Sequence, residues 1–407
     1  MKPFVSLYVK EFRRFWFGQA ISLLGTWMHY VAQGWLVYKL TRSPLYLGLA
    51  GAALTFPILF FTLFGGIIAD KYKKKNILVF IQYLALIPPL VLGLLTILKI
   101  VTVWHVIIIA FLMGTINAIE FPVRQSFLIE MVGKKKLLNA IALHSAAFNG
   151  ARMLGPLLAG FIIEKYDLAI CFFINTISFI PIIIVLRSIK ANFPVTPGSS
   201  QGVVRDLKEG ISFIISKREV SNIILIIMVF SLFVIPYNQF LPVFAEDILR
   251  TGARGLGLLM GSAGAGAFTG AVFLAIRGNI KRKEVYMFSS ALVFPASLLV
   301  FSLSRLPLLS YLVLFAAGFT IVSFIANANN TIQQLVTDHI RGRIMSVYSL
   351  VLLGMAPIGS IFIGTIADTL GTPLTITLSS SVALLSAIVF VTAEMRKLRT
   401  CSMGGTL

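Results

Sequence analysis

The stretch Ile77-Leu-Val-Phe-Ile-Gln-Tyr-Leu-Ala-Leu-Ile-Pro-Pro-Leu-Val-Leu-Gly-Leu-Leu-Thr-Ile-Leu98 holds 22 residues and no charged side chain. At about 1.5 Å per residue, a helix of this length crosses the roughly 30 Å hydrocarbon core of a bilayer. Eleven further apolar runs of similar length lie before and after it. Twelve such runs exclude a water-soluble core, so the sequence predicts an all-α integral membrane protein.

The apolar runs fall into two groups of six around a polar gap from about Arg187 to Val220. We expect the spans at Phe15 to Tyr38, Leu45 to Ala69, Ile77 to Leu98, Val103 to Glu120, Asn139 to Ile163, Ala169 to Leu186, Ser221 to Ala245, Arg254 to Ile276, Val285 to Ser304, Leu308 to Gln334, Ile344 to Ala367 and Leu374 to Ala393. Residues 1–190 are expected to form an N-terminal six-helix half. Residues 191–220 form a cytoplasmic linker with an amphipathic segment, and residues 221–407 form a C-terminal half with a short tail.

Charge distribution predicts the orientation of these spans. The chain is 57% apolar and 12% charged, with a mean hydropathy of +0.92 and a formal net charge of +20. In a soluble protein this charge would suggest nucleic acid as a partner, but here 27 of the 35 Lys and Arg residues lie in the termini and alternate loops. The positive-inside rule then places both termini and the linker in the cytoplasm and leaves no role for nucleic acid.

An internal repeat relates the two halves. Gly48 aligns with Gly257 at an offset of 209 residues. Near the same offset a polar triplet recurs with spacing i, i+3, i+7, which places each triplet on one helix face; it comprises Asn117, Glu120 and Arg124 in the first half and Asn327, Asn330 and Gln334 in the second. Parallel repeats of six spans are typical of transporters with two pseudo-two-fold halves around a central site.

Two motifs resemble those of the major facilitator superfamily. The segment Gly66-Ile-Ile-Ala-Asp70-Lys71-Tyr-Lys-Lys-Lys75 resembles the loop signature between its second and third spans, although Lys73 replaces the usual glycine of the turn. The segment Asn149-Gly-Ala-Arg152-Met-Leu-Gly155-Pro156-Leu-Leu-Ala-Gly160 resembles the Gly-Pro motif of the superfamily's exporters. The resemblance implies the major facilitator fold.

A third set of segments resembles one branch of that superfamily, the branch containing the bacterial enterobactin (siderophore) exporter and the macrolide efflux proteins. The segments are Phe121 to Glu130, Asn139 to Ser145, Gln333 to Asp338 and Arg341 to Arg343. The resemblance runs along nearly the whole chain and implies a multi-pass protein of a bacterial cytoplasmic (inner) membrane.

The resemblance also implies a gate on the cytoplasmic side, in which Asp70 faces the start of span 11 near Arg343. The gate motif comprises Gly66, Asp70, Lys71, Arg341 and Arg343. The alternative is that this loop is only a solvated, orientation-setting segment. Gly155, Pro156 and Gly160 permit a kink and close helix packing, which supports export only through the resemblance.

Arg152 lies inside a span, where a cation costs about 2.5–3.5 kcal/mol and should face protein or a watery cavity. It either binds an anionic part of the substrate, pairs with a carboxylate that changes protonation, or holds two helices together. Glu120 is the best-placed carrier of a proton; the alternative is a simple ion pair with Arg124, four residues later.

The polar residues of the spans predict a central pathway, and some of them are expected to form interhelical hydrogen bonds instead. The predicted substrate and proton pathway comprises Gln33, Asn117, Glu120, Asn149, Arg152, Tyr237, Asn238, Gln239, Asn327 and Asn330. Amides and a phenol among aromatic and Met side chains suit a bulky amphiphile.

The leading hypothesis is a monomeric secondary exporter that exchanges protons for an organic solute such as a siderophore. The alternatives are a macrolide or multidrug efflux pump, a lipid flippase or a transport-inactive sensor. The sequence contains no P-loop, so ATP does not drive transport directly. It contains no H-E-x-x-H, and its four histidines are scattered along the chain, so we expect no enzyme, no cofactor and no metal site.

Overall fold

The computed structural model describes residues 4–189, 203–277 and 283–403, apart from a few side chains such as those of Asp70 and Asp338. Within this part of the chain all regular structure is helical. The first six long helices are α1 (Lys10–Thr41), α2 (Pro44–Lys71), α3 (Lys74–Ile97), α4 (Val103–Val132), α5 (Leu137–Lys165) and α6 (Leu168–Ser188). Short 3-10 turns at Val5–Tyr8 (η1) and Lys134–Lys136 (η2) precede α1 and α5.

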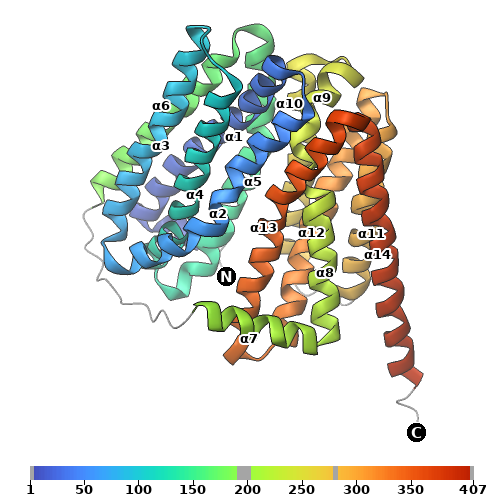
Figure 1. Cartoon of the computed structure of the whole chain (residues 1–407). Coiled ribbons are helices and arrows are strands. Elements are labelled where there is room, and N and C mark those ends of the chain that lie inside the picture. The colour runs from blue at the N-terminus through green and yellow to red at the C-terminus, as the bar shows by residue number, and fades with distance from the viewer. Residues whose placement is uncertain (1–3, 190–202, 278–282, 404–407) are drawn as a thin grey trace.

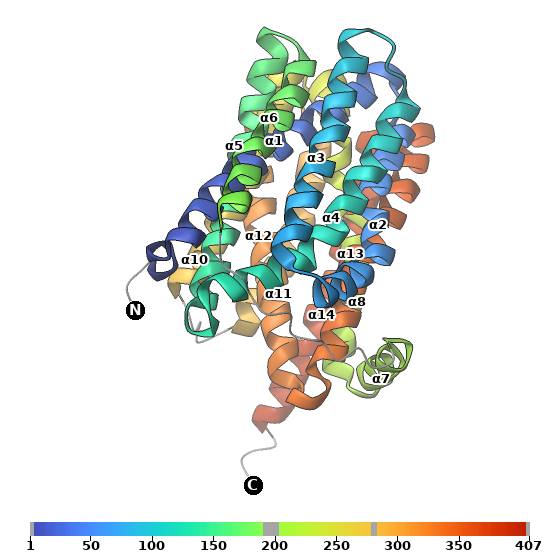
Figure 2. The same cartoon turned by 90° about the vertical axis from the view of Figure 1, so that its left-hand side faces the viewer.

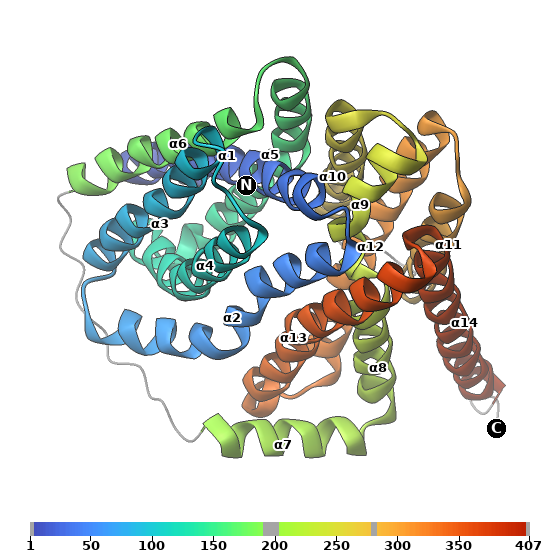
Figure 3. The same cartoon turned by 45° about the horizontal axis from the view of Figure 1, so that its top comes forward.

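The second group of helices follows α7 (Val203–Ser216). It comprises α8 (Arg218–Phe233), η3 (Ile235–Phe240), α9 (Leu241–Val243), η4 (Phe244–Ile248), α10 (Gly252–Arg277), α11 (Lys283–Leu303), α12 (Pro307–Leu335), α13 (Asp338–Leu370) and α14 (Thr372–Met403). Figure 3 shows the two groups side by side, with α1 to α6 on one side and α8 to α14 on the other.

Eleven helical segments of the described chain are long and apolar enough to cross a membrane. The more polar α1, with 32 residues, adds a twelfth helix and packs against α5 and α6. These helices confirm the predicted all-α membrane architecture. Apolar side chains cover much of the outer surface, as expected of a protein whose solvent is lipid.

The seventh predicted span is interrupted. The sequence predicts one helix from Ser221 to Ala245, but α8 ends at Phe233 and the chain continues through η3, α9 and the π-helical turn η4. Pro236 and Pro242 each lack the backbone N–H that a continuous helix requires, which explains the break. Three consecutive polar side chains, Tyr237 to Gln239, therefore lie on a 3-10 turn rather than on a regular helix face.

Two close helix contacts join the halves, and glycines make both possible. At Gly257 on α10, an added Cβ would lie 2.5 Å from the Pro156 carbonyl oxygen and 3.0 Å from the Gly160 Cα, both on α5. At Gly48 on α2, it would lie 2.3 Å from the Ser360 oxygen and 3.3 Å from the Gly364 Cα, both on α13. Residues i and i+4 of the partner helix meet the glycine in each case, so the repeat relation between Gly48 and Gly257 extends to their contacts. We call these contacts the α5–α10 seam and the α2–α13 seam.

The glycines of α10 serve two neighbours. Gly257, Gly261 and Gly264 meet α5, where an added Cβ on Gly264 would lie 2.5 Å from the Arg152 carbonyl oxygen. Gly266 and Gly270 instead face the backbone of α12. The glycine-rich composition of this helix thus permits close backbone approach on two faces.

The two ends of the bundle differ. The N- and C-termini and α7 lie toward one end, which we call the termini end; the opposite end is the far end (Figures 1 and 2). Helix α7 lies across the termini end and contacts α8 and α13. An added Cβ on its Gly210 would lie 3.0 Å from the Arg343 carbonyl oxygen, and Lys217 Nζ donates a hydrogen bond to the Leu335 carbonyl at 2.5 Å.

Candidate functional site

Two polar residues one turn apart on α4 begin the candidate site. Asn117 Nδ2 donates a hydrogen bond to the Tyr30 hydroxyl on α1 at 2.9 Å. Glu120 Oε1 accepts a hydrogen bond from Arg124 Nη1 at 2.6 Å, and Glu120 is only 6% exposed. Removing one partner of a buried ion pair leaves an uncompensated charge at a cost of about 3–5 kcal/mol. Each residue of this pair therefore needs the other to neutralise its charge.

Aromatic rings connect this face of α4 to Arg152. Trp27 lies one turn before Tyr30 on α1, and the two rings meet edge to face at 5.9 Å. The Arg152 guanidinium on α5 lies over the Trp27 ring, with its carbon 5.8 Å from the centroid. Two of the predicted pathway residues, Asn117 and Arg152, are thus connected across α4, α1 and α5 by the side chains of Tyr30 and Trp27.

Gln33 contacts a histidine one turn earlier on α1, and its place in the pathway stays a prediction. Its Oε1 lies 3.0 Å from His29 Nε2, and both side chains are buried. The His29 ring packs against Phe172 on α6 at 5.0 Å between centroids. Its Nδ1 has no hydrogen-bond partner among the described residues. Gln33 therefore lies in a polar contact inside the N-terminal half.

Three predicted pathway amides bond within their own helices. Asn149 and Asn327 each donate a hydrogen bond to the carbonyl four residues earlier, at 2.9 and 2.8 Å. The exposed Asn330 accepts a hydrogen bond from Gln334 Nε2 at 3.2 Å. None of these bonds joins the two halves, so their place in the pathway stays a prediction.

The η3 turn brings polar groups from the second half to the first. Gln239 packs against α2, where an added Cβ on Gly51 would lie 2.5 Å from its Cδ. Tyr237 is 3% exposed, and its hydroxyl makes no hydrogen bond of normal geometry within the described chain, although Asn238 is a polar neighbour. Tyr237 also lies near Arg152, across the boundary between the halves.

The gate motif is partly described. Gly66 lies near the end of α2 with no atom within 4 Å of an added Cβ, and Lys71 is the last residue of that helix. The side chain of Asp70 lies outside the described residues, so its predicted contact stays a prediction.

The partner side of the gate motif contacts the linker helix. Arg341 and Arg343 occupy the first two turns of α13. Arg343 Nη1 donates to Glu209 Oε2 on α7 and forms an ion pair with it. This contact ties the linker to the helix that carries half of the predicted gate, and nothing in the sequence spacing had suggested it.

Charged contacts join the halves at the far end. Lys39 Nζ lies 2.6 Å from Glu246 Oε1, and Arg42 contacts both Glu246 and Asp247 at 3.2 and 3.3 Å. The Tyr38 hydroxyl donates to Asp247 as well. Arg42 adopts a left-handed conformation with φ of 52°, which a non-glycine residue rarely adopts. We call this group of five residues the far-end latch.

Two further contacts lie at the same end. The Ser43 hydroxyl donates a hydrogen bond to Asp368 Oδ1, which joins the start of α2 to the end of α13. Arg254 lies 4.0 Å from Glu164 and joins α10 to α5. The far end thus holds the halves together through side chains as well as through the two seams.

Sequence reasoning missed three aromatic residues of the site. Trp27 and Tyr30 link Arg152 to α4, and Phe148 meets the Trp27 ring at 5.6 Å. Trp and Tyr are enriched at membrane interfaces, so their occurrence one turn apart in the middle of a span was the available signal. In the described part of the chain, no group of three or more His, Cys, Asp or Glu residues could hold a metal ion.

The chain is similar to a known family and to several transporters. The family model of transmembrane secretion effectors matches residues 1–404. The staphyloferrin A transporter of Staphylococcus aureus is 26% identical over 365 residues, covering 88% of this chain and 90% of that protein. The multidrug efflux pump Tap of Mycolicibacterium fortuitum is 24% identical and covers 91% of this chain and 93% of its own. Macrolide efflux protein A of Streptococcus pyogenes is 20% identical, covering 95% and 97%.

Solved structures share the fold. A bacterial homologue of the human lysosomal transporter Spinster superposes with a TM-score of 0.73 at 12% identity, covering 97% of this chain and 98% of the other. A bacterial homologue of the iron transporter ferroportin superposes with a TM-score of 0.71 at 14% identity, covering 94% and 98%. At these identities the likeness shows the fold alone.

Proposed function

The chain belongs to the transmembrane secretion effector family of major facilitator superfamily transporters, and we propose that it is a proton-coupled exporter of a siderophore-like organic solute. It is a multi-pass membrane transporter of small organic solutes rather than an enzyme. The proposed cargo class follows the staphyloferrin A transporter, which matches over most of both chains. The proposed direction follows the two efflux relatives.

The observation that carries this proposal is the line of contacts across α4, α1 and α5. It contains one buried carboxylate, Glu120, and one cation without a carboxylate partner among the described residues, Arg152. A transporter that exchanges protons for a solute needs a group that can take up a proton and a group that can hold the solute. Asn117, one turn before Glu120 on α4, contacts Tyr30, and Tyr30 contacts the Trp27 ring on which Arg152 lies.

The proposed orientation places both termini and α7 in the cytoplasm, because 27 of the 35 basic residues lie on that side. The far-end latch and the two seams then lie on the outer side. In this state the outer ends of the halves are held together, as expected of a transporter that faces the cytoplasm. We further propose that residues 1–190 and 221–407 move as two bodies, with residues 191–220 as their linker, in a monomer of the bacterial cytoplasmic membrane.

Transport into inverted membrane vesicles tests the proposal. Staphyloferrin A and erythromycin serve as probes, each with and without an imposed pH gradient. The proposal predicts gradient-dependent uptake of staphyloferrin A that vanishes when the gene is deleted. Uptake without gradient dependence would contradict proton coupling, and no uptake of either probe would favour a flippase or a sensor.

Macrolide or multidrug efflux is the second candidate function. The aromatic contacts of Trp27 with Tyr30 and Phe148 favour it, because clustered rings suit bulky amphiphiles. Gradient-driven uptake of erythromycin alone would select this function. Comparing the secreted small molecules of the deletion strain by mass spectrometry, together with its macrolide sensitivity, identifies the natural cargo.

A further inference from the structure

Arg152 is a cation inside the membrane-spanning region without an anionic partner. No hydrogen bond or ion pair of its side chain occurs within the described chain, and its one ring contact is with Trp27. The carboxylate Glu120 on α4 is paired with Arg124. The α5 backbone at Arg152 packs closely on Gly264 of α10, which fixes the position of this helix. The guanidinium itself remains available to bind a ligand. A half-buried cation held in this way favours an anionic ligand.

Aromatic side chains flank the guanidinium. Phe148 precedes Arg152 by four residues, so both lie on the same face of α5. The Phe148 ring meets Trp27 edge to face at 5.6 Å and is still 40% exposed. Trp27 in turn contacts the Tyr30 ring. Exposed ring surface next to an unpaired cation suits a ligand that carries both an aromatic group and a negative charge.

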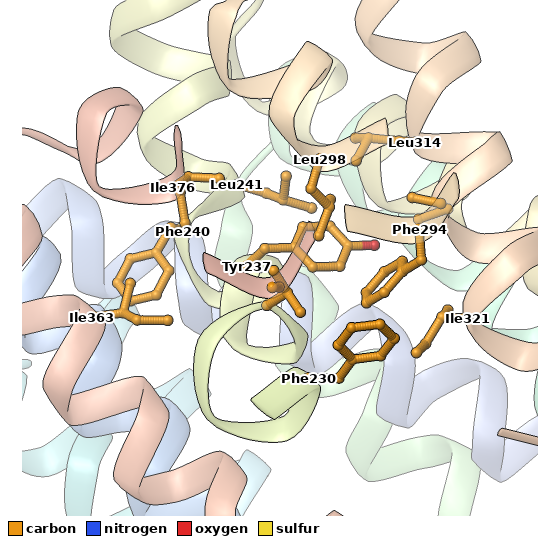
Figure 4. Packing of buried hydrophobic residues seen from close by; sticks show 14 of the residues in the cluster. Phe230, Tyr237, Phe240, Leu241, Phe294, Leu298, Leu314, Ile321, Ile363 and Ile376 are labelled. Carbon is orange, nitrogen blue, oxygen red and sulfur yellow. The ribbon is translucent and has the colours of Figure 1, made fainter. Parts of the chain in front are cut away.

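A second buried polar group lies near the same charge and comes from the other half. The Tyr237 hydroxyl is buried without a hydrogen bond of normal geometry in the described chain, and it lies near Arg152. Figure 4 shows the Tyr237 ring among Phe230, Phe294 and Leu298, with its hydroxyl as the one oxygen among the labelled side chains. A low-dielectric surrounding strengthens the effect of each donor on a nearby anion.

We propose that Arg152, Trp27 and Phe148 bind an aromatic carboxylate group of the cargo, with Tyr237 acting on the same carboxylate from the second half. The guanidinium supplies a planar fork of donors that matches a carboxylate, and the rings pack against the aromatic group. Because the groups come from both halves, the bound carboxylate draws the halves together. This inference rests on the proposed function and names the chemistry of its cargo.

Binding of a matched pair of probes tests the inference. The probes are 1-naphthylacetate and its neutral amide, 1-naphthylacetamide, which differ in charge but hardly in shape. Calorimetry on the full-length protein in nanodiscs should give a Kd for the acid at least tenfold lower than that for the amide. Arg152→Gln should weaken acid binding tenfold or more and amide binding less than twofold. Equal affinity of the unaltered protein for the two probes would overturn the inference.

Three further variants sharpen the test. Tyr237→Phe, which keeps the ring packing, should weaken acid binding about threefold, and no change would overturn the role of the hydroxyl. Phe148→Leu should weaken both probes alike, and unchanged binding of both would overturn the aromatic part. Arg305→Gln removes an exposed far-end cation and should change neither Kd. If Arg152→Gln does not fold, Tyr237→Phe and the acid-to-amide ratio still decide the outcome.

Failure of this inference is distinguishable from failure of the proposed function. Gradient-driven flux of staphyloferrin A is measured with the same protein preparation. Flux that persists without any preference for the acid overturns the carboxylate site and leaves the exporter intact. A strong preference for the acid without gradient-driven flux of any probe overturns the exporter and leaves the binding site intact.

Discussion

Glu120 and Arg124 lie one turn apart on α4, and their 2.6 Å ion pair is buried beside the Asn117–Tyr30 hydrogen bond. This contact is compatible with both hypotheses for Glu120, a proton carrier and a structural ion pair, because a paired carboxylate can still exchange its proton when the pair opens. The sequence predicted the pair from the spacing of four residues alone. It could not predict Tyr30 as a neighbour, because contacts between helices depend on packing.

Replacing both partners of this pair distinguishes a proton-carrying Glu120 from a purely structural ion pair. Glu120→Gln should abolish the dependence of flux on the pH gradient, since the amide carries no exchangeable charge. If the pair were only structural, the double variant Glu120→Gln/Arg124→Gln would restore gradient-dependent flux, because no buried charge would be left unpaired. We expect the double variant to fold better than the single one and to remain uncoupled, as measured by flux and thermal unfolding.

The hydrogen-bond partners of the other predicted site residues could not be predicted from the sequence. An amide such as Asn149 can bond to the carbonyl four residues earlier or to a neighbouring helix, and its residue type favours neither. Gln33 contacts His29, whose ring meets that of Tyr30. The sequence identified which polar residues are embedded in spans, but their partners follow from the helix positions.

Helices of the two halves meet at the α5–α10 seam and the α2–α13 seam. Internal repetition aligned Gly48 with Gly257, and the structure shows that each meets the backbone of a partner helix from the other half. The sequence could therefore predict a relation between the elements, although not which helices they contact. The break after Phe233 was missed because two prolines are common in membrane helices that stay continuous.

Enlarging a seam glycine should impair both assembly and transport. A Cβ at Gly257 would lie 2.5 Å from a backbone oxygen, so Gly257→Val should cost about 1–3 kcal/mol of stability by overpacking. Gly48→Val should cost a similar amount, because its contacts are equivalent. Gly150→Ala on α5 is the matched control, with no atom within 4 Å of its added Cβ. Thermal unfolding and flux should change little in the control; an equal loss in all three variants would contradict the seams.

The gate motif links elements at the termini end. If Asp70 holds α2 to the start of α13, Asp70→Asn should reduce flux severalfold while membrane insertion stays normal, since an anion near an N-terminal helix end is stabilising. Glu209→Gln, which removes the observed partner of Arg343, tests whether α7 shares this role. Undiminished flux in Asp70→Asn, with normal insertion by quantitative blotting, would leave the loop as an orientation signal only.

At the scale of the whole molecule, the far-end latch should bias the equilibrium between the two orientations of the halves. Exposed ion pairs contribute about 0.2–1 kcal/mol each, so the latch as a whole contributes on the order of 1–2 kcal/mol, a factor of about 5–30 in populations. Glu246→Gln/Asp247→Asn should therefore raise the population with a separated far end. The same shift should follow from high salt, which screens these charges.

Spin-label distances measure this shift directly. Labels at residues 99 and 305, in far-end loops of opposite halves and in a background without the native cysteines, should show a longer-distance population that grows in the latch variant. Lys165→Gln is the control, because it removes a far-end cation outside the latch. An unchanged distance distribution in the latch variant would show that the seams alone hold this end.

Gradient-driven flux is the measurement that tests proton-coupled export most directly. The full-length protein in proteoliposomes is supplied with staphyloferrin A, and transport is followed while a pH gradient is imposed, reversed or dissipated. Proton-coupled export predicts accumulation of the solute against its own gradient, in the direction opposite to proton flow. It also predicts loss of that accumulation in Glu120→Gln. Flux that is equal in all three conditions, or that is coupled as strongly in Glu120→Gln as in the unaltered protein, would contradict it.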